Sequence, residues 1–183
     1  MKKLVIAVVA LAAIATGWYA FRPERLFLNQ TVNESPDPGP GSNAMSAVTE
    51  TPAMSAATES PAMSAASESR VVATGMFHDG SHETVGMATI REYPDGRRVL
   101  RLTGFHTSNG PDVQVLLVAA NDAKDNETVT KSGFVHVGAL KGNIGDQNYE
   151  LPANVDLSKH RAVTIWCRRF GVNFGTAPLT SHS

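Results

Sequence analysis

Three copies of a nine-residue unit rich in Ala, Ser, Thr, Glu and Pro divide this 183-residue chain into parts with different folding prospects. The copies occupy residues 44–52, 53–61 and 62–70. A unit this short and polar cannot bury enough apolar surface to offset the entropy lost on ordering. We therefore predict a disordered linker over residues 29–70, and a single folded domain over residues 71–183.

Residues 1–28 have the pattern of a membrane segment. Lys2 and Lys3 precede an apolar run from residue 4 to residue 21, which as a helix would be about 27 Å long, close to the thickness of a bilayer core. The leading lysines orient that end toward the cytoplasm. We predict an uncleaved single-pass anchor in the cell membrane, with the domain on the extracytoplasmic side. Cleavage near residues 13–15, a small-x-small sequence, would instead give a secreted protein.

Charge and motifs exclude several function classes. Lys and Arg total 16 and Asp and Glu total 17, so the net charge of −1 gives no basic surface for nucleic acid. The sequence has no Gly-x-Ser-x-Gly, phosphate loop, dinucleotide-binding glycine pattern or Cys-x-x-Cys. This favours an electron-transfer or binding domain over a conventional enzyme.

Short apolar runs separated by turn residues predict an all-β fold for the domain. We expect a single antiparallel β-sandwich, without a helix longer than a turn or two. The sequence Tyr93-Pro94-Asp95-Gly96 predicts a hairpin turn, because Pro presets one φ angle and Gly supplies a positive one. The run 112–119 is apolar on both faces, which is typical of a central strand. The predicted strands are 71–78, 84–92, 97–105, 112–119, 134–140, 147–151 and 162–174.

The chain has one cysteine, Cys167, so no intramolecular disulfide can stabilise it. Alternation along the last predicted strand places Cys167 with Val163 and Ile165 on one face, and Thr164 and Trp166 on the other. Two readings stay open. A free cysteine often packs as a small apolar residue. Alternatively it is a redox thiol or a soft-metal or haem-iron ligand, with the following arginines favouring the thiolate.

The spacing of the histidines and methionines gives little support for a metal site. His78 and His82 form a His-x₃-His pair, but on a strand end and turn rather than on one helix face. Met45, Met54 and Met63 recur every nine residues, and thioether sulfur suits Cu(I), yet duplication of a linker unit explains the spacing as well. We predict no metal site from these residues.

The domain resembles the DM thirteen family of extracellular electron-transfer modules. The resemblance covers about 105 residues and lies in five ordered blocks. They are Gly75-Met76-Phe77 with His82 and Gly86; Leu100-Arg101-Leu102 with Phe105; Asn109-Gly110-Pro111-Asp112-Val113; Leu140-Lys141-Gly142-Asn143-Ile144-Gly145-Asp146-Gln147 with Tyr149, Leu151 and Pro152; and Val163-Thr164-Ile165-Trp166-Cys167 with Phe170 and Phe174.

This resemblance implies a membrane-anchored redox module that uses Cys167 as a bare thiol or to hold a prosthetic group, haem ahead of copper. The family histidine position falls on His82, which is the implied second cofactor-binding residue. An unknown redox partner is implied as well. The alternative is a non-redox adhesion or partner-binding sandwich on a stalk, with Cys167 as core filler. We expect the glycines of 110–112 and 141–146 to shape turns rather than carry chemistry.

Overall fold

The structure, a computed structural model, describes residues 28–36 and 69–182. The apolar run of the predicted anchor and the nine-residue repeats up to residue 68 lie outside the described residues. Among the residues described, no helix has the length and apolar character needed to cross a membrane.

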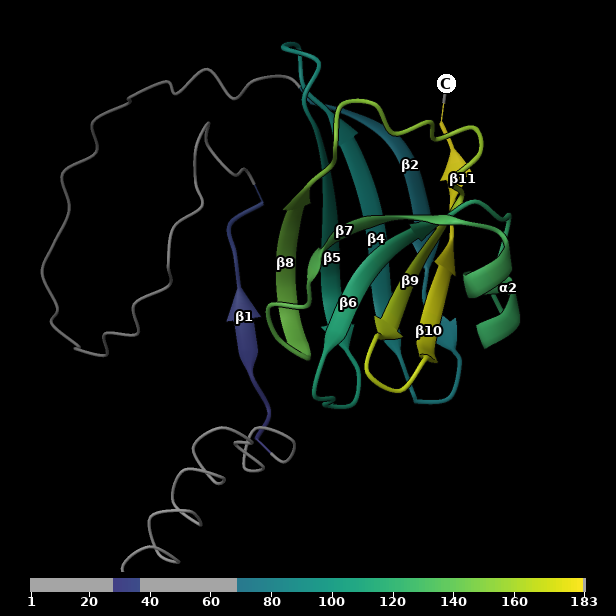
Figure 1. Ribbon diagram of the computed structural model, residues 1–183. Helices are drawn as coiled ribbons and strands as arrows, with labels where there is room; N and C mark the ends of the chain where they lie inside the picture. The colour runs from purple at the N-terminus through teal and green to yellow at the C-terminus, as the bar shows by residue number, and fades with distance from the viewer. Residues whose placement is uncertain (1–27, 37–68, 183) are drawn as a thin grey trace, which may run out of the picture.

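The described chain is built almost entirely from strands, joined by short loops and one six-residue helix (Figure 1). The elements are β1 (Thr31–Asn33), β2 (Arg70–Met76), β3 (His78–Asp79), β4 (Val85–Glu92), β5 (Arg98–His106), β6 (Val113–Val118), α2 (Asn126–Lys131), β7 (Phe134–Ala139), β8 (Ile144–Glu150), β9 (Ala162–Cys167), β10 (Val172–Pro178) and β11 (Thr180–Ser181).

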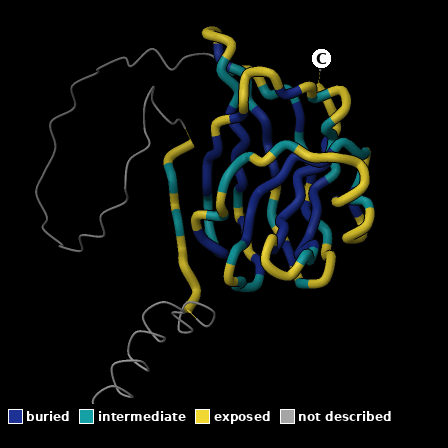
Figure 2. Tube along the Cα trace, viewed as in Figure 1, coloured by how far each residue is buried: buried dark blue, intermediate teal, exposed yellow. Residues whose placement is uncertain are grey.

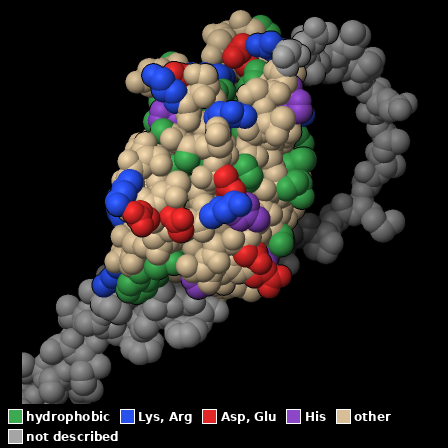
Figure 3. All heavy atoms as spheres, turned by 90° about the vertical axis from the view of Figure 1, so that its right-hand side faces the viewer, with side chains coloured by type: hydrophobic (Ala, Val, Ile, Leu, Met, Phe, Trp, Pro, Cys, Tyr) green, Lys and Arg blue, Asp and Glu red, His purple; other side chains and the backbone are tan. Residues whose placement is uncertain are grey.

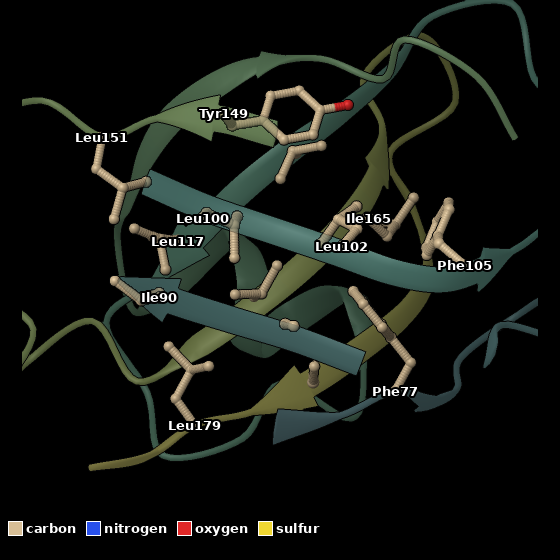
Figure 4. Packing of buried hydrophobic residues seen from close by; sticks show 14 of the residues in the cluster. Phe77, Ile90, Leu100, Leu102, Phe105, Leu117, Tyr149, Leu151, Ile165 and Leu179 are labelled. Atoms are coloured by element: carbon tan, nitrogen blue, oxygen red, sulfur yellow. The ribbon is translucent and has the colours of Figure 1, made fainter. Parts of the chain in front are cut away.

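These strands form two sheets with the main core between them. One sheet has the order β1-β8-β5-β4-β2-β11 and the other β3-β10-β9-β6-β7. Inward side chains of both sheets make one buried cluster, which includes Ile90, Leu100 and Leu102 from the first sheet and Leu117 and Ile165 from the second (Figure 4). In Figure 2 dark blue runs along the inner strands of both sheets, whereas yellow marks mainly the connections and part of β1, as expected of a domain that buries its central strands. The predicted β-sandwich is confirmed.

The turn and the buried strand follow the sequence pattern. The β4–β5 hairpin closes at Tyr93-Pro94-Asp95-Gly96, where the Gly96 amide donates to the Tyr93 carbonyl oxygen at 2.9 Å and Gly96 has a φ of 82°. β6 is buried along its whole length, lies between β7 and β9, and so fits the predicted central strand. A second, smaller cluster on its outer side includes Trp166 and Val129 of α2.

Three expectations need correction. The single strand predicted over 162–174 is two strands, β9 and β10, because the chain reverses after Cys167 through a four-residue loop ending at Gly171. The sandwich is not wholly antiparallel, since β1 pairs with β8 in parallel. Residues 29–36, assigned to the linker, include β1 and lie against the domain; the rest of the linker to residue 68 lies outside the described residues.

Candidate functional site

Cys167 lies at the end of β9, inside the sandwich. Its side chain has no exposed surface and belongs to the main core cluster. Its backbone partners are Val113 of β6 on one side and Val172 of β10 on the other. Val163 and Ile165 are buried in the same cluster, while Trp166 lies in the outer one, so the predicted alternation is confirmed. The packed position is the one that a small apolar side chain would take.

The arginine that follows Cys167 points elsewhere. The Arg168 Nε donates to Asp112 Oδ2 at 2.8 Å, and its side chain is 68% exposed. The Arg168 amide also donates to the Asp112 carbonyl oxygen at 2.9 Å. The guanidinium therefore neutralises a surface carboxylate rather than facing the thiol.

His82 lies in the loop between β3 and β4. Its ring packs on Phe174, with the ring centroids 4.0 Å apart, and its amide donates to the Phe174 carbonyl oxygen at 3.2 Å. Phe174 belongs to the core cluster that contains Cys167. The two predicted site residues thus lie at the same end of the sandwich, but no hydrogen bond joins His82 to Cys167 in the described part of the chain.

A cleft of about 600 Å³ opens at this end. Three segments line it: residues 28–30 before β1, the loop 108–112 with the start of β6, and the loop 140–143 with the end of β7. The lining residues are Leu28, Asn29, Gln30, Ser108, Asn109, Gly110, Pro111, Asp112, Val113, Gln114, Ala139, Leu140, Gly142 and Asn143. The wall therefore mixes amide side chains with apolar ones.

Val113 connects the cleft to Cys167. It lines the cleft, and it is the register partner of Cys167 across β6 and β9. Directly opposite residues of an antiparallel pair have Cα atoms about 5 Å apart. Val113 is therefore a residue of the cleft wall that lies beside Cys167 in the sheet.

Asn143 holds the segments of the cleft together. Its side chain is buried; Nδ2 donates to the Thr107 carbonyl oxygen at 3.0 Å, and Oδ1 accepts from the Gln30 amide at 2.7 Å. Asn109 adds a second tie, because its Nδ2 donates to the Leu28 carbonyl oxygen at 3.0 Å. Two family-block asparagines therefore fix the path of residues 28–30.

Gln147 supports the loop 140–143 from below. It is fully buried and its Nε2 donates to the Gly142 carbonyl oxygen at 2.7 Å. Its Oε1 accepts from the amides of Lys141 and Gly142 and from the Tyr149 hydroxyl. Burial raises the pKa of Tyr149 well above its ordinary value, so the phenol stays protonated as a donor. The expectation that this loop is architectural agrees with these bonds.

Two glycines allow the strap, residues 28–36, to lie against β8. A Cβ on Gly142 would be 2.5 Å from the Gln30 carbonyl oxygen, and one on Gly145 would meet the Val32 carbonyl oxygen. Gly145 also has a φ of 99°, which side chains other than hydrogen disfavour. Gly142 and Gly145 therefore leave the space that the strap occupies.

Arg101 fixes the other end of the strap, a role that the sequence analysis missed. Its Nη1 donates to the carbonyl oxygens of Glu34 and Ser35, both at 3.1 Å. Its Nη2 lies 2.6 Å from Asp146 Oδ2. The sequence does carry one signal for this role, because Arg101 stands between Leu100 and Leu102 in a predicted strand. A cation in such a partly buried position needs polar partners.

The outer wall of the cleft carries a chain of hydrogen bonds. The Gln114 Nε2 donates to Asp112 Oδ1 at 2.5 Å, and the His136 Nε2 donates to Gln114 Oε1 at 2.6 Å. Gln114 is buried and His136 exposed. Together with Arg168 this fixes Asp112 at the mouth of the cleft.

A metal centre is not apparent in the part of the chain that the structure describes. No group of three or more His, Cys, Asp or Glu side chains there could hold a metal ion. Nor does the donor set fit a haem held by Cys167 and His82: the sulfur is covered by packed side chains, and the cleft lining contains no His, Cys or Met.

Comparison with protein families gives one match. The sequence profile described as electron transfer DM13 matches residues 76–179. No curated protein and no solved structure matches the chain significantly. The matched range contains Cys167, His82 and two of the three segments that line the cleft; it begins after the strap.

Proposed function

Because the chain belongs to the electron transfer DM13 family, we propose that it is a membrane-anchored electron-transfer protein that works outside the cytoplasm. We place its redox site at the end of the sandwich that holds the cleft and Cys167. The apolar run before residue 22, with lysines ahead of it, supports the anchor and its orientation.

One observation carries the assignment of the site. Residues from four of the five blocks that carry the family resemblance lie at the same end of the domain, around the cleft and Cys167. The loops 109–112 and 140–143 line the cleft, Val113 of the cleft wall lies beside Cys167 in the sheet, and Phe174 packs on His82. Pockets with a few convergent polar groups are the usual places for small molecules to bind.

In this proposal Cys167 is the redox residue and acts from within the core. An electron, unlike an atom, can pass through one layer of packed side chains. A one-electron acceptor bound in the cleft would gain one electron as the Cys167 thiol loses one electron and releases its proton to solvent, and the reverse transfer would restore the thiol. A carrier seated in the cleft would contact Val113, the register partner of Cys167. His82 is a positioning residue here, because it packs on Phe174 and touches the thiol by no hydrogen bond among the described residues.

The test is a redox titration of the full-length protein purified from its native membrane. Its absorbance is recorded with and without dithionite, and the titration is repeated for Cys167→Ala. We expect a reversible signal in the native protein that Cys167→Ala removes. Val163→Ala is the matched control, since Val163 lies on the same face of the same strand and is equally buried. It should lose stability but keep the signal.

A signal that survives in Cys167→Ala would place the redox group elsewhere in the chain. A native protein that shows no signal, with a thiol that alkylates only after denaturation, would favour the second candidate. That candidate is a partner-binding sandwich in which Cys167 fills the core, and the complete burial of the cysteine is the observation in its favour.

A further inference from the structure

We propose that the β9–β10 hairpin loop, residues 168–171, docks on the lipid bilayer, so that the cleft end of the domain faces the membrane. This inference rests on the membrane anchor of the proposed function. It adds an orientation and a contact surface, which the family match does not supply.

The loop exposes an aromatic side chain at its tip. Phe170 is 68% exposed and follows Arg168 and Arg169, which are exposed as well. The Gly171 amide donates to the Cys167 carbonyl oxygen at 2.9 Å and closes the loop. A phenylalanine directly preceded by two arginines, the first of them paired with Asp112, is a composition suited to the interface of an anionic membrane, where the ring enters the acyl boundary and nearby cations favour the headgroup region.

The strap brings the chain to the same end of the domain. Leu28, at the start of the strap, is 63% exposed and lines the cleft together with Asp112. Asp112 in turn holds Arg168 at 2.8 Å. Leu28 and the hairpin loop therefore flank a single rim. Figure 3 shows hydrophobic side chains gathered at the lower edge of the domain, with a basic side chain beside them.

The length of chain before the strap limits how far this rim can lie from the bilayer. The apolar run ends at Phe21, and only residues 22–27 separate it from Leu28. A fully extended chain between Phe21 and Leu28 spans at most about 25 Å. The hydrogen bonds that hold Gln30 and Leu28 to the domain keep this limit in force whatever the segment 37–68 does.

The opposite end of the sandwich supplies a control of the same residue type. Phe134 is 48% exposed and lies where β7 begins, beside Val118. Val118 is at the end of β6 opposite Val113, so Phe134 is at the far end from the cleft. In the proposed orientation Phe134 faces water.

The experiment uses the full-length chain reconstituted in phosphatidylglycerol–phosphatidylethanolamine vesicles. A nitroxide is attached to Phe170→Cys or to Phe134→Cys, and the unsubstituted chain shows how little the buried Cys167 takes up label. Collisions are measured with oxygen, which concentrates in lipid, and with a water-soluble nickel chelate. We expect the ratio of oxygen to chelate collisions to be severalfold higher at position 170 than at position 134.

Adding Arg169→Glu to the Phe170→Cys chain should lower that ratio at position 170, because the charge reversal repels phosphatidylglycerol. The ratio at position 134 should not respond. Equal ratios at the two positions, in a chain that stays in the vesicles after an alkaline wash, would overturn the docking proposal and leave the anchor intact. A chain that washes off would overturn the anchor and the docking together.

Discussion

The two ends of the sandwich are closed in different ways. At the cleft end, side chains join segments more than a hundred residues apart, as Asn143 does with Gln30. At the far end the loops are closed locally: Asp95 accepts from the Arg97 amide, and Asp156 accepts from Ser158. The shape of the end with the candidate site is therefore fixed by side chains from distant segments, whereas the turns of the far end also close through bonds within a few residues, in addition to longer contacts such as that of Arg98 Nη2 with the Ala153 carbonyl oxygen.

The largest expected effect on stability in this comparison is that of Gln147→Ala. The truncation leaves the buried amide of Gly142 without its acceptor and removes one of the two acceptors of the Lys141 amide, which keeps the Tyr149 hydroxyl. We expect the free energy of unfolding to fall by about 3 kcal/mol. Asp156→Ala, at the far end, is the control and should cost much less than Gln147→Ala, because that carboxylate is exposed. Denaturant unfolding measures the free energy of unfolding of both variants. Similar losses of stability in the two would contradict the distinction between the ends.

Two glycines with positive φ separate local strain from long-range contact. Gly96→Ala, at the far end, meets open space and should cost about 1 kcal/mol through backbone strain alone. Gly145→Ala carries similar strain and also meets the Val32 carbonyl oxygen, so the strap should leave β8. Hydrogen exchange of residues 31–34 should then speed up in Gly145→Ala only. Unchanged protection would show that the strap tolerates a Cβ there.

The smallest expected effect concerns an ion pair beside α2, away from both ends. Burial lowers the pKa of His78, but the hydrogen bonds to Asp122 and to the Asp79 carbonyl oxygen raise it more, so the pKa lies above its ordinary value. A raised pKa in the folded state stabilises the protein below the unfolded value of about 6.5, and this contribution is lost as pH rises through the folded pKa.

The stability advantage of the native chain over His78→Gln should therefore shrink between mildly acidic and mildly alkaline pH. The imidazole is partly exposed, so solvent screening keeps the change small. Unfolding of the two chains at each pH measures it. A stability difference between the native chain and His78→Gln that grows with pH would contradict the raised pKa of His78.

Features that depend on neighbouring residues could be predicted from the sequence. The β4–β5 turn follows from the chemistry of Pro94 and Gly96, and the two faces of β9 follow from alternation. The same alternation placed Cys167 on one face with Val163 and Ile165 but left open whether its thiol is reachable, and the structure shows it fully buried. What the pattern could not supply was the packing that separates it from His82.

Features that depend on distant residues could not be predicted. β1 is a three-residue polar strand that exists because Gly145 and Arg101, far along the chain, make room and hydrogen bonds for it. The cleft arises from three segments that meet only in the folded state. The reversal after Cys167 had a local signal in Gly171, but the apolar residues on both sides suggested an unbroken strand.

In the membrane-anchored arrangement that we propose, the parallel pairing of β1 with β8 has a consequence for shedding of the domain. Residues 37–68 connect β1 to β2 in the sequence, and these two strands belong to the same sheet. A protease that cuts within this segment would break the polypeptide without freeing the domain, since β1 would stay bound as a complementing strand. Release would require a second event, the dissociation of a short peptide from the edge of the sheet.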